Sequence, residues 1–257
     1  VADLTGNGIT VSNVAVPTLT SASYDANTGV LAVTGTGLLK LSGASNDIDV
    51  TKLTLTGEGG STHTLTSTSV EITSGTGFSV TLNSADKAAI NQILNKNGTT
   101  STGGTTYNLA GAEDWASGAD AGLTVADLTG NGITVSNVAV PTLTSATYDA
   151  NTGVLAVTGT GLLKLSGGAN DIDVTKLTLK GQGAGTRTLT TTSVEITSGT
   201  GFSVTLNSAD KTAVNLILDK NGTSSSDSTT YNLAGAEDWA SGADASVTVA
   251  DLTGNGI

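Results

Sequence analysis

Carboxylates are the side chains best placed to do chemistry in this chain, because most other reactive types are missing. The 257 residues include no Cys and one His, whereas 22 Asp and Glu outnumber 10 Lys and Arg and set the net charge at −12. Without Cys, the sequence excludes disulfides, thiolate metal sites and cysteine nucleophiles. Calcium prefers carboxylate, amide and carbonyl oxygens, and an acidic chain favours cations over nucleic acids as partners.

Two acidic concentrations lead to a calcium hypothesis. Asp47 and Asp49 lie two residues apart on a loop ahead of an expected strand. The second group is formed by Glu113, Asp114, Asp120 and Asp127. Neither has the spacing of an EF-hand. Acidic loop residues also cap turns and keep a surface soluble, so that interpretation stays open beside metal binding. The candidate ligands are Asp25, Asp47, Asp49, Glu113, Asp114, Asp120, Asp127, Asp149, Asp171, Asp173, Glu237, Asp238, Asp244 and Asp251.

An internal repeat dominates the sequence. Residues 1–14, VADLTGNGITVSNV, recur at 125–138 and begin a third time at 249–257, an offset of 124 residues each time. Across one period, 19 of 124 positions differ, with no insertion or deletion. A period of this length is a whole domain rather than one coil of a solenoid. We therefore expect about two domains of a longer array.

The domain frame follows from where strands are expected to begin. We predict that residues 1–14 are the last hairpin of a preceding repeat, that 15–138 form one repeat, and that 139–257 form a second repeat lacking most of its final strand. In this frame Pro141 stands at the start of a strand, where its missing N–H costs least. The competing frame, in which VADLTGNGITVSNV leads each domain, stays open.

Alternating apolar and polar residues predict an all-β fold. Leu31 and Val33 alternate with small residues, as do Leu53 and Leu55, and Gly-, Asn- and Asp-rich turns separate such stretches. Short strands of this kind are typical of antiparallel β-sandwiches. One stretch per copy has helical spacing instead, opening at Asn83 and closing near Gly98, and predicts a short inserted helix.

Differences between the copies suggest which positions are exposed. Thr56 becomes Lys180, Glu58 becomes Gln182, His63 becomes Arg187 and Gly103 becomes Asp227. Since size and charge change freely there, we expect these side chains to face solvent. Loss of the one His also removes any catalytic or metal role for it that both copies share, and the chain shows no phosphate-binding spacing. We predict no enzymatic activity.

The whole chain resembles the immunoglobulin-like tandem repeats of very large bacterial surface proteins, of the adhesin or extracellular-fibre type. The likeness lies in the near-identical copies, the acidic Thr- and Gly-rich composition, the absence of Cys and the DLTGNG turn at Asp127–Gly132. The resemblance implies tandem immunoglobulin-like sandwiches at the bacterial cell surface, serving as spacers for adhesion and often stiffened by calcium between domains. No stretch approaches the roughly 20 apolar residues of a membrane span.

Stacking such sandwiches predicts a specific junction. In an immunoglobulin-like topology Asp171 and Asp173 of the second copy approach Asp25 of the first, with the Asp251–Gly256 turn nearby. Carboxylates gathered there repel one another unless a cation neutralises them. The hypothesis is that calcium bridges the junction and stiffens the array.

Three other functions stay open. A glycan- or receptor-binding module would use surface aromatics, and an ice-binding surface is suggested by Thr-x-Thr runs but lacks the short period that a flat Thr ladder needs. A self-assembling fibre could form if Ile9–Val14 of a neighbour completed the last sandwich by strand addition. The aromatic candidates are Tyr24, Tyr107, Trp115, Phe78, Tyr148, Tyr231, Trp239 and Phe202.

Overall fold

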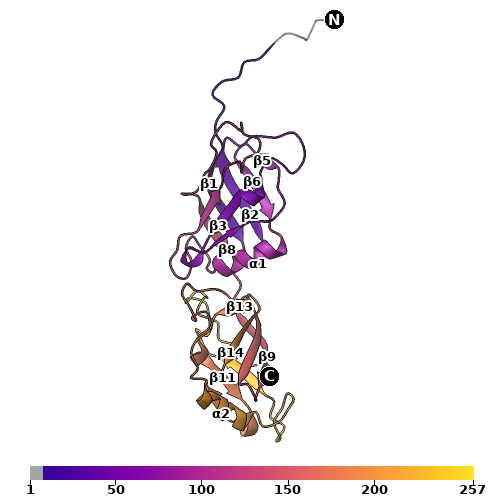
Figure 1. Ribbon diagram of the computed structural model, residues 1–257, viewed down its shortest axis with the longest axis vertical. Helices are drawn as coiled ribbons and strands as arrows, with labels where there is room; N and C mark the ends of the chain where they lie inside the picture. The colour runs from indigo at the N-terminus through magenta and orange to yellow at the C-terminus, as the bar shows by residue number, and fades with distance from the viewer. Residues whose placement is uncertain (1–7) are drawn as a thin grey trace.

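The computed structural model describes residues 8–257, so residues 1–7 of the predicted leading hairpin lie outside it. Strands hold 35% of the chain and helices 13%, in sandwich-like sheets, which confirms the prediction of a mostly β fold. We call residues 15–138 module 1 and residues 139–257 module 2. The modules are stacked end to end along the long axis, with the N-terminal tail leaving module 1 at the end away from module 2 (Figure 1).

Module 1 contains eight strands and one α-helix. The elements are β1 (Thr18–Asp25), β2 (Val30–Thr36), β3 (Leu53–Thr56), β4 (Thr62–Thr64), β5 (Ile72–Ser74), β6 (Gly77–Thr81), α1 (Ser84–Ile93), β7 (Asn108–Gly111) and β8 (Gly132–Ser136). Short 3₁₀ turns, η1 (Val50–Lys52) and η2 (Glu58–Gly60), flank β3.

Module 2 repeats these elements at the same offset as the sequence, with η3 (Val174–Lys176) and η4 (Gln182–Ala184) in place of the 3₁₀ turns. Its elements are β9 (Thr142–Asp149), β10 (Val154–Thr160), β11 (Leu177–Lys180), β12 (Thr186–Thr188), β13 (Ile196–Ser198), β14 (Gly201–Thr205), α2 (Ser208–Ile217) and β15 (Asn232–Gly235). The position equivalent to β8 is described only as far as Ile257.

Strand β8 joins the two layers of module 1. The sheet order is β4-β3-β7-β8-β1-β2-β6-β5, and β8 runs parallel to β1 while pairing with β7 at one residue, Asn108 opposite Gly132. In module 2 the corresponding strands form two separate sheets, β13-β14-β10-β9 and β12-β11-β15. The difference shows that β8 is what makes the two layers one continuous sheet.

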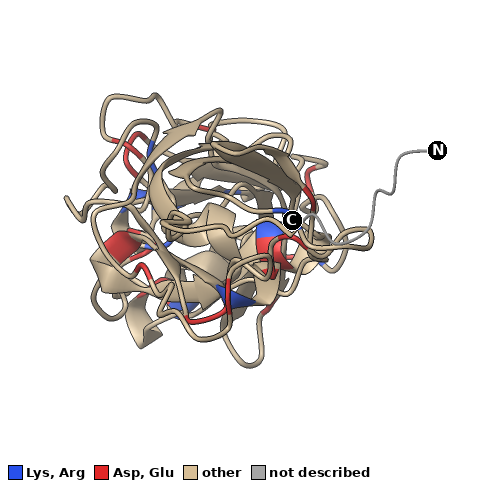
Figure 2. Ribbon diagram, turned by 90° about the horizontal axis from the view of Figure 1, so that it is seen from above, with Lys and Arg blue, Asp and Glu red and all other residues tan. Residues whose placement is uncertain are grey.

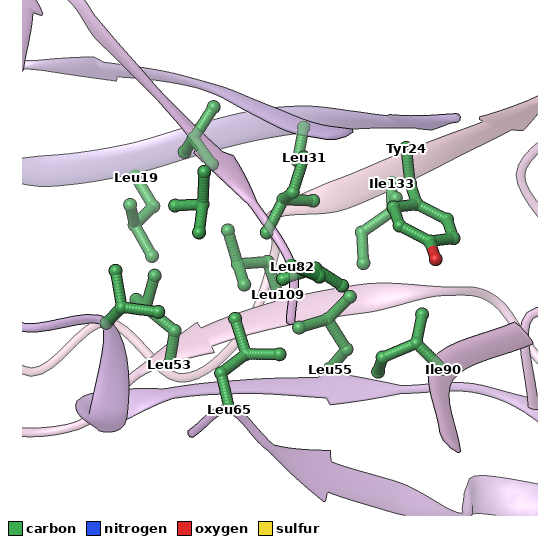
Figure 3. Packing of buried hydrophobic residues seen from close by; sticks show 14 of the residues in the cluster. Leu19, Tyr24, Leu31, Leu53, Leu55, Leu65, Leu82, Ile90, Leu109 and Ile133 are labelled. Carbon is green, nitrogen blue, oxygen red and sulfur yellow. The ribbon is translucent and has the colours of Figure 1, made fainter. Parts of the chain in front are cut away.

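The core lies between the layers and comes from the inward positions of the strands. Leu31 of β2 and Leu53 and Leu55 of β3 are fully buried, and Figure 3 shows them facing one another across the gap together with Ile133 of β8. Burying each such side chain contributes roughly 1.5–3 kcal/mol. The period-2 pattern therefore predicts which faces meet.

Helix α1 begins as predicted and ends earlier. Asn83 accepts a hydrogen bond from the backbone N–H of Asp86, which is the expected N-cap, and Ile90 and Ile93 face the core. The last helical residue is Ile93 rather than one near Gly98. The prediction of the helix is confirmed, whereas the prediction of its end is wrong.

Asp86 does more than complement the helix dipole. Its carboxylate is fully buried and accepts hydrogen bonds from the backbone N–H groups of Thr66 and Ser67 at 2.8 Å each, and from both of their hydroxyls. His63 Nε2 lies 2.9 Å from Asp86 Oδ1. The carboxylate therefore ties the β4–β5 loop to the helix N-terminus.

The expectation that His63 and its counterpart Arg187 simply face solvent is wrong. In module 2 Asp210 takes the place of Asp86, and Arg187 donates to it from Nη2 at 2.6 Å and from Nε at 3.0 Å. Each side chain thus reaches the equivalent buried carboxylate of its own module, Asp86 for His63 and Asp210 for Arg187. The substitution is tolerated because each residue offers a ring or guanidinium N–H in the same place.

This network predicts a loss of stability in acid. Burial acts to raise the pKa of Asp86 and Asp210, but hydrogen bonds led by Ser67 and Thr191 outweigh it and lower each pKa from 3.8 to about 2. Each ionised group therefore contributes about 2 kcal/mol that is fully present above pH 4 and is lost as the pH falls towards 2. Denaturant unfolding across this range measures it. The Asp86→Asn, Asp210→Asn double variant should lose less stability over the same range, and equal losses would contradict the assignment.

Candidate functional site at the module junction

The junction between the modules is held by direct polar contacts. Asn95 Nδ2 donates to the carbonyl oxygen of Lys164 at 2.7 Å, and the Lys164 N–H donates to the Gln92 carbonyl at 3.2 Å. Thr102 Oγ1 donates to the Gly242 carbonyl at 3.1 Å. These contacts join the end of helix α1 and the loop before β7 to two loops of module 2, the one between β10 and η3 and the one after β15.

Glu58 is the central charged group of this junction. Its side chain is buried, with Oε2 accepting from the Gly103 N–H at 2.8 Å and from Asn95 Nδ2 at 3.2 Å, and Oε1 accepting from the Ser166 N–H of module 2 at 3.1 Å. Burial acts to raise the pKa of Glu58, but the N–H donors outweigh it and hold the pKa below its ordinary value. An ionised carboxylate therefore receives donors from both modules.

The expectation that Glu58 faces solvent is consequently wrong. Its counterpart Gln182 is half-buried and accepts from the Ser226 hydroxyl and the Asp227 N–H, both within module 2. The difference between the two copies is positional: one side chain lies inside a junction and the other on a free end. Comparison of two sequences cannot separate these cases, because both carry the same local pattern.

Apolar packing and one ion pair complete the junction. Val138, Pro141 and Leu163 line a small cavity of about 30 Å³, and Gln92 and Leu162 are among the residues that line a larger hollow of about 300 Å³ between the modules. Lys96 Nζ lies 3.6 Å from Asp244 Oδ1. Both side chains are partly exposed, and such a pair contributes about 1 kcal/mol or less, so the buried contacts carry most of the attachment.

Most of the predicted metal ligands already bind the main chain of their own module. Asp47 accepts from the N–H groups of Leu41 and Ile72, and Glu113 accepts from those of Val125 and Ala126. Asp171 and Glu237 repeat these roles, Asp49 and Asp173 cap the 3₁₀ turns, Asp25 and Asp149 cap the β1–β2 and β9–β10 turns, and Asp127 and Asp251 hold the starts of β1 and β9.

The pKa shifts in opposite directions at one predicted ligand and its counterpart, Asp47 of module 1 and Asp171 of module 2. At Asp47 burial acts to raise the pKa, but the Leu41 and Ile72 N–H groups and the Lys40 charge prevail and lower it. At Asp171 burial prevails, Glu195 adds to it, and the pKa rises. Lys164, the counterpart of Lys40, has its main chain engaged by Gln92 and Asn95 at the junction.

The structure brings some acidic candidates together. Asp173, Asp238 and Asp244 line one hollow of about 260 Å³ beside Thr102 of module 1. Their counterparts Asp49, Asp114 and Asp120 line a matching hollow at the free end of module 1. Within residues 8–257, however, no three Asp, Glu or His side chains converge in a way that could hold a metal ion as they stand. Calcium binding therefore stays a prediction.

The expected approach of Asp171 and Asp173 to Asp25 is not seen among the contacts of the described residues. Asp25 caps its own turn and accepts from Asn137 Nδ2 at 3.0 Å, and within residues 8–257 no contact joins it to a carboxylate of module 2. Of the predicted ligands in the described chain, Asp244 alone has an ion-pair partner across the junction. The principal junction residues, Glu58 and Asn95, were missed because their sequence context is an ordinary polar loop.

The aromatic residues are mostly internal. Trp115 is fully buried, lies 6.3 Å from the Phe78 ring and donates from Nε1 to the Val125 carbonyl, and Trp239 repeats this arrangement. Tyr148 is the partly exposed member of the set. Seen down the long axis, acidic and basic residues are scattered around the molecule (Figure 2). No described feature forms an aromatic platform of the kind that sugar-binding surfaces use.

The comparisons with known proteins found no family model and no curated protein that match this chain. Within residues 8–257 no helix is long and apolar enough to cross a bilayer.

A glycine pair offers a matched test of the junction. A Cβ on Gly59 would lie 2.3 Å from Ser166 Cβ, whereas one on Gly183 would meet nothing within 4 Å, and both glycines have a φ of 61°. Gly59→Ala and Gly183→Ala therefore carry the same backbone strain, and Gly59→Ala alone should loosen the junction. ¹⁵N relaxation should show separate tumbling times for the two modules in Gly59→Ala and a common one in Gly183→Ala. Common tumbling in both would contradict the packing described.

Proposed function

We propose that the chain is a structural array whose modules act as rigid spacers. The observation that supports this most is the junction, where a buried carboxylate takes donors from both modules. Glu58 and Asn95 each bond to at least two groups of module 1 and to one group of module 2, so bending the junction breaks the contacts to module 2 together. Leaving such groups buried and unpaired costs about 1–3 kcal/mol each, which opposes a hinge.

The connecting segment supports the same function. Val138 N–H donates to Asn97 Oδ1 at 3.0 Å, and Pro141 is buried at the entry to β9. Only Ala139 and Val140 separate these fixed points. A linker this short restricts relative motion of the modules, whereas long Gly- or Ser-rich linkers would permit it.

We further propose that the modules are immunoglobulin-like repeats of a bacterial surface protein and work outside the cell. The support is the resemblance in composition and repetition, together with the absence of Cys and Met, which leaves few oxidisable side chains. In such a setting the array would span distance and present another part of the protein. It is not proposed to catalyse a reaction.

A rigid spacer should keep its length when ionic strength changes. Salt screens partly exposed pairs such as Lys96–Asp244 more strongly than fully buried contacts. We expect small-angle X-ray scattering to give the same elongated profile, matching the stacked modules, at low and at high salt. A profile that broadens into an ensemble of bent shapes at high salt would show that exposed charges, not buried contacts, hold the modules.

Calcium is proposed as an additional stabiliser of the junction. Asp173, Asp238 and Asp244 line one hollow there, and their repulsion would fall if a divalent ion lay among them. Calcium should then raise the melting temperature and a chelator should lower it again, with a smaller response in Asp238→Asn. Identical melting with calcium and with chelator would remove calcium from the proposal and leave the direct contacts as the sole cause of stiffness.

A further inference from the structure

Module 2 contains a groove where module 1 contains strand β8. The groove has a volume of about 350 Å³ and lies between β9 and the Asn221–Thr223 loop, next to Ile257. Gly256 already occupies the first position of the missing strand, since it pairs with Ser145 and Asn232 as Gly132 pairs with Ser21 and Asn108. The groove is therefore the remaining part of a strand position rather than a general surface hollow.

The residues around the groove show what belongs in it. Tyr24 and Ala26, which β8 covers in module 1, are buried, whereas their counterparts Tyr148 and Ala150 are partly or fully exposed. Leu94 is fully buried, and its counterpart Leu218 is only partly so. An apolar surface left open along a strand position favours the addition of another strand.

Module 1 also shows which main-chain groups the strand uses. Gly98 exchanges N–H and carbonyl hydrogen bonds with Val135, at 2.9 and 2.8 Å, and Ala26 N–H donates to the Ser136 carbonyl at 2.9 Å. Asn137 Nδ2 donates to Asp25 Oδ2 at 3.0 Å. In module 2 the equivalent groups of Gly222, Ala150 and Asp149 face the position that the strand would fill.

The chain carries a second copy of this strand outside any sheet. Residues 8–14, GITVSNV, have the same sequence as residues 132–138, and Ile9, Val11 and Val14 are 88%, 71% and 52% exposed. Three residues, Ala15–Pro17, separate this segment from β1 at the end of module 1 that points away from module 2 (Figure 1). The segment therefore cannot reach the groove of its own chain.

We propose that, in the polypeptide of residues 1–257, the groove of module 2 binds residues Thr10–Val14 of a second copy as an added strand. Val11 enters the position that Val135 fills in module 1, parallel to β9. The segment Ala15–Pro17 that follows repeats Ala139–Pro141 in sequence, so module 1 of the second copy arrives on module 2 as module 2 sits on module 1. Contacts of this head-to-tail kind do not close and produce a filament.

This inference does not depend on the spacer function. Chains could join in this way whether or not the array serves as a spacer, and the modules could be rigid without joining. Assembly and inter-module tumbling are measured separately, so failure of one is distinguishable from failure of the other.

The first test uses two Asp substitutions of equal charge. Strand β8 buries Val135 and exposes Thr134, so Val11→Asp should weaken association by about tenfold or more, whereas Thr10→Asp should leave it nearly unchanged. Sedimentation velocity over a range of concentrations should show a ladder of oligomers for the unmodified chain and for Thr10→Asp. A monomer at every concentration, or equal weakening by the two variants, would overturn the proposal.

The second test is a disulfide trap, which the absence of native Cys makes unambiguous. In module 1 Ser23 lies opposite Thr134, so Thr10 of one chain should lie opposite Thr147 of another. Mixing Thr10→Cys and Thr147→Cys chains under oxidising conditions should give a disulfide-linked heterodimer. Ser23→Cys is the matched control, because β8 already occupies its side of β1, and it should not cross-link to Thr10→Cys. Equal cross-linking at both positions, or none at Thr147→Cys, would contradict strand addition.

Discussion

A carboxylate removed from water must be given hydrogen-bond donors, and this requirement organises the whole molecule. Asp47, Asp86 and Glu113 each accept from two backbone N–H groups, which belong to loops except for that of Ile72 at the start of β5. A loop held in this way needs neither a disulfide nor a large aromatic core. The same principle acts between modules, where Glu58 accepts from Gly103 within its module and from Ser166 beyond it.

This use of carboxylates changes how the acidic composition should be interpreted. A net charge of −12 suggests cation binding, yet many of the carboxylates face main-chain donors rather than one another. Several approach one another in the hollow beside Asp173 and Asp244, where Lys96 pairs with Asp244, and in the matching hollow of module 1. Rigidity in the proposed array therefore arises first from satisfied hydrogen bonds, to which a divalent ion would add.

Much of the fold could be predicted from the sequence, because local pattern decides it. The alternation around Leu31 and Leu53 and the cap at Asn83 each depend on neighbouring residues, and the strands and the helix appear where expected. The early end of the helix at Ile93 was not predictable from the same pattern, since Leu94 is fully buried in module 1 yet lies outside the helix. Leu94 is apolar because it is buried in the core, and not because it continues the helix.

The junction could not be predicted, because its residues act through contacts far apart in the chain. Glu58 meets Ser166, and Asn95 meets Lys164, across distances that no sequence period records. The substitution of Glu58 by Gln182 in the second copy looked like tolerance of any residue, whereas it occurs on a face with different surroundings. His63 and Arg187 misled in the opposite way, by changing type while keeping the same carboxylate partner.

In the proposed array, the buried contacts of the junction alone hold each module in one orientation relative to the next. Residual dipolar couplings measured on the full chain in calcium-free buffer test it most directly, because they report the orientation of each module separately. We expect couplings from residues 18–136 and from 142–256 to fit a single alignment tensor with the stacked arrangement of the structure. Two tensors of clearly different magnitude would show that the modules reorient freely, and would contradict it.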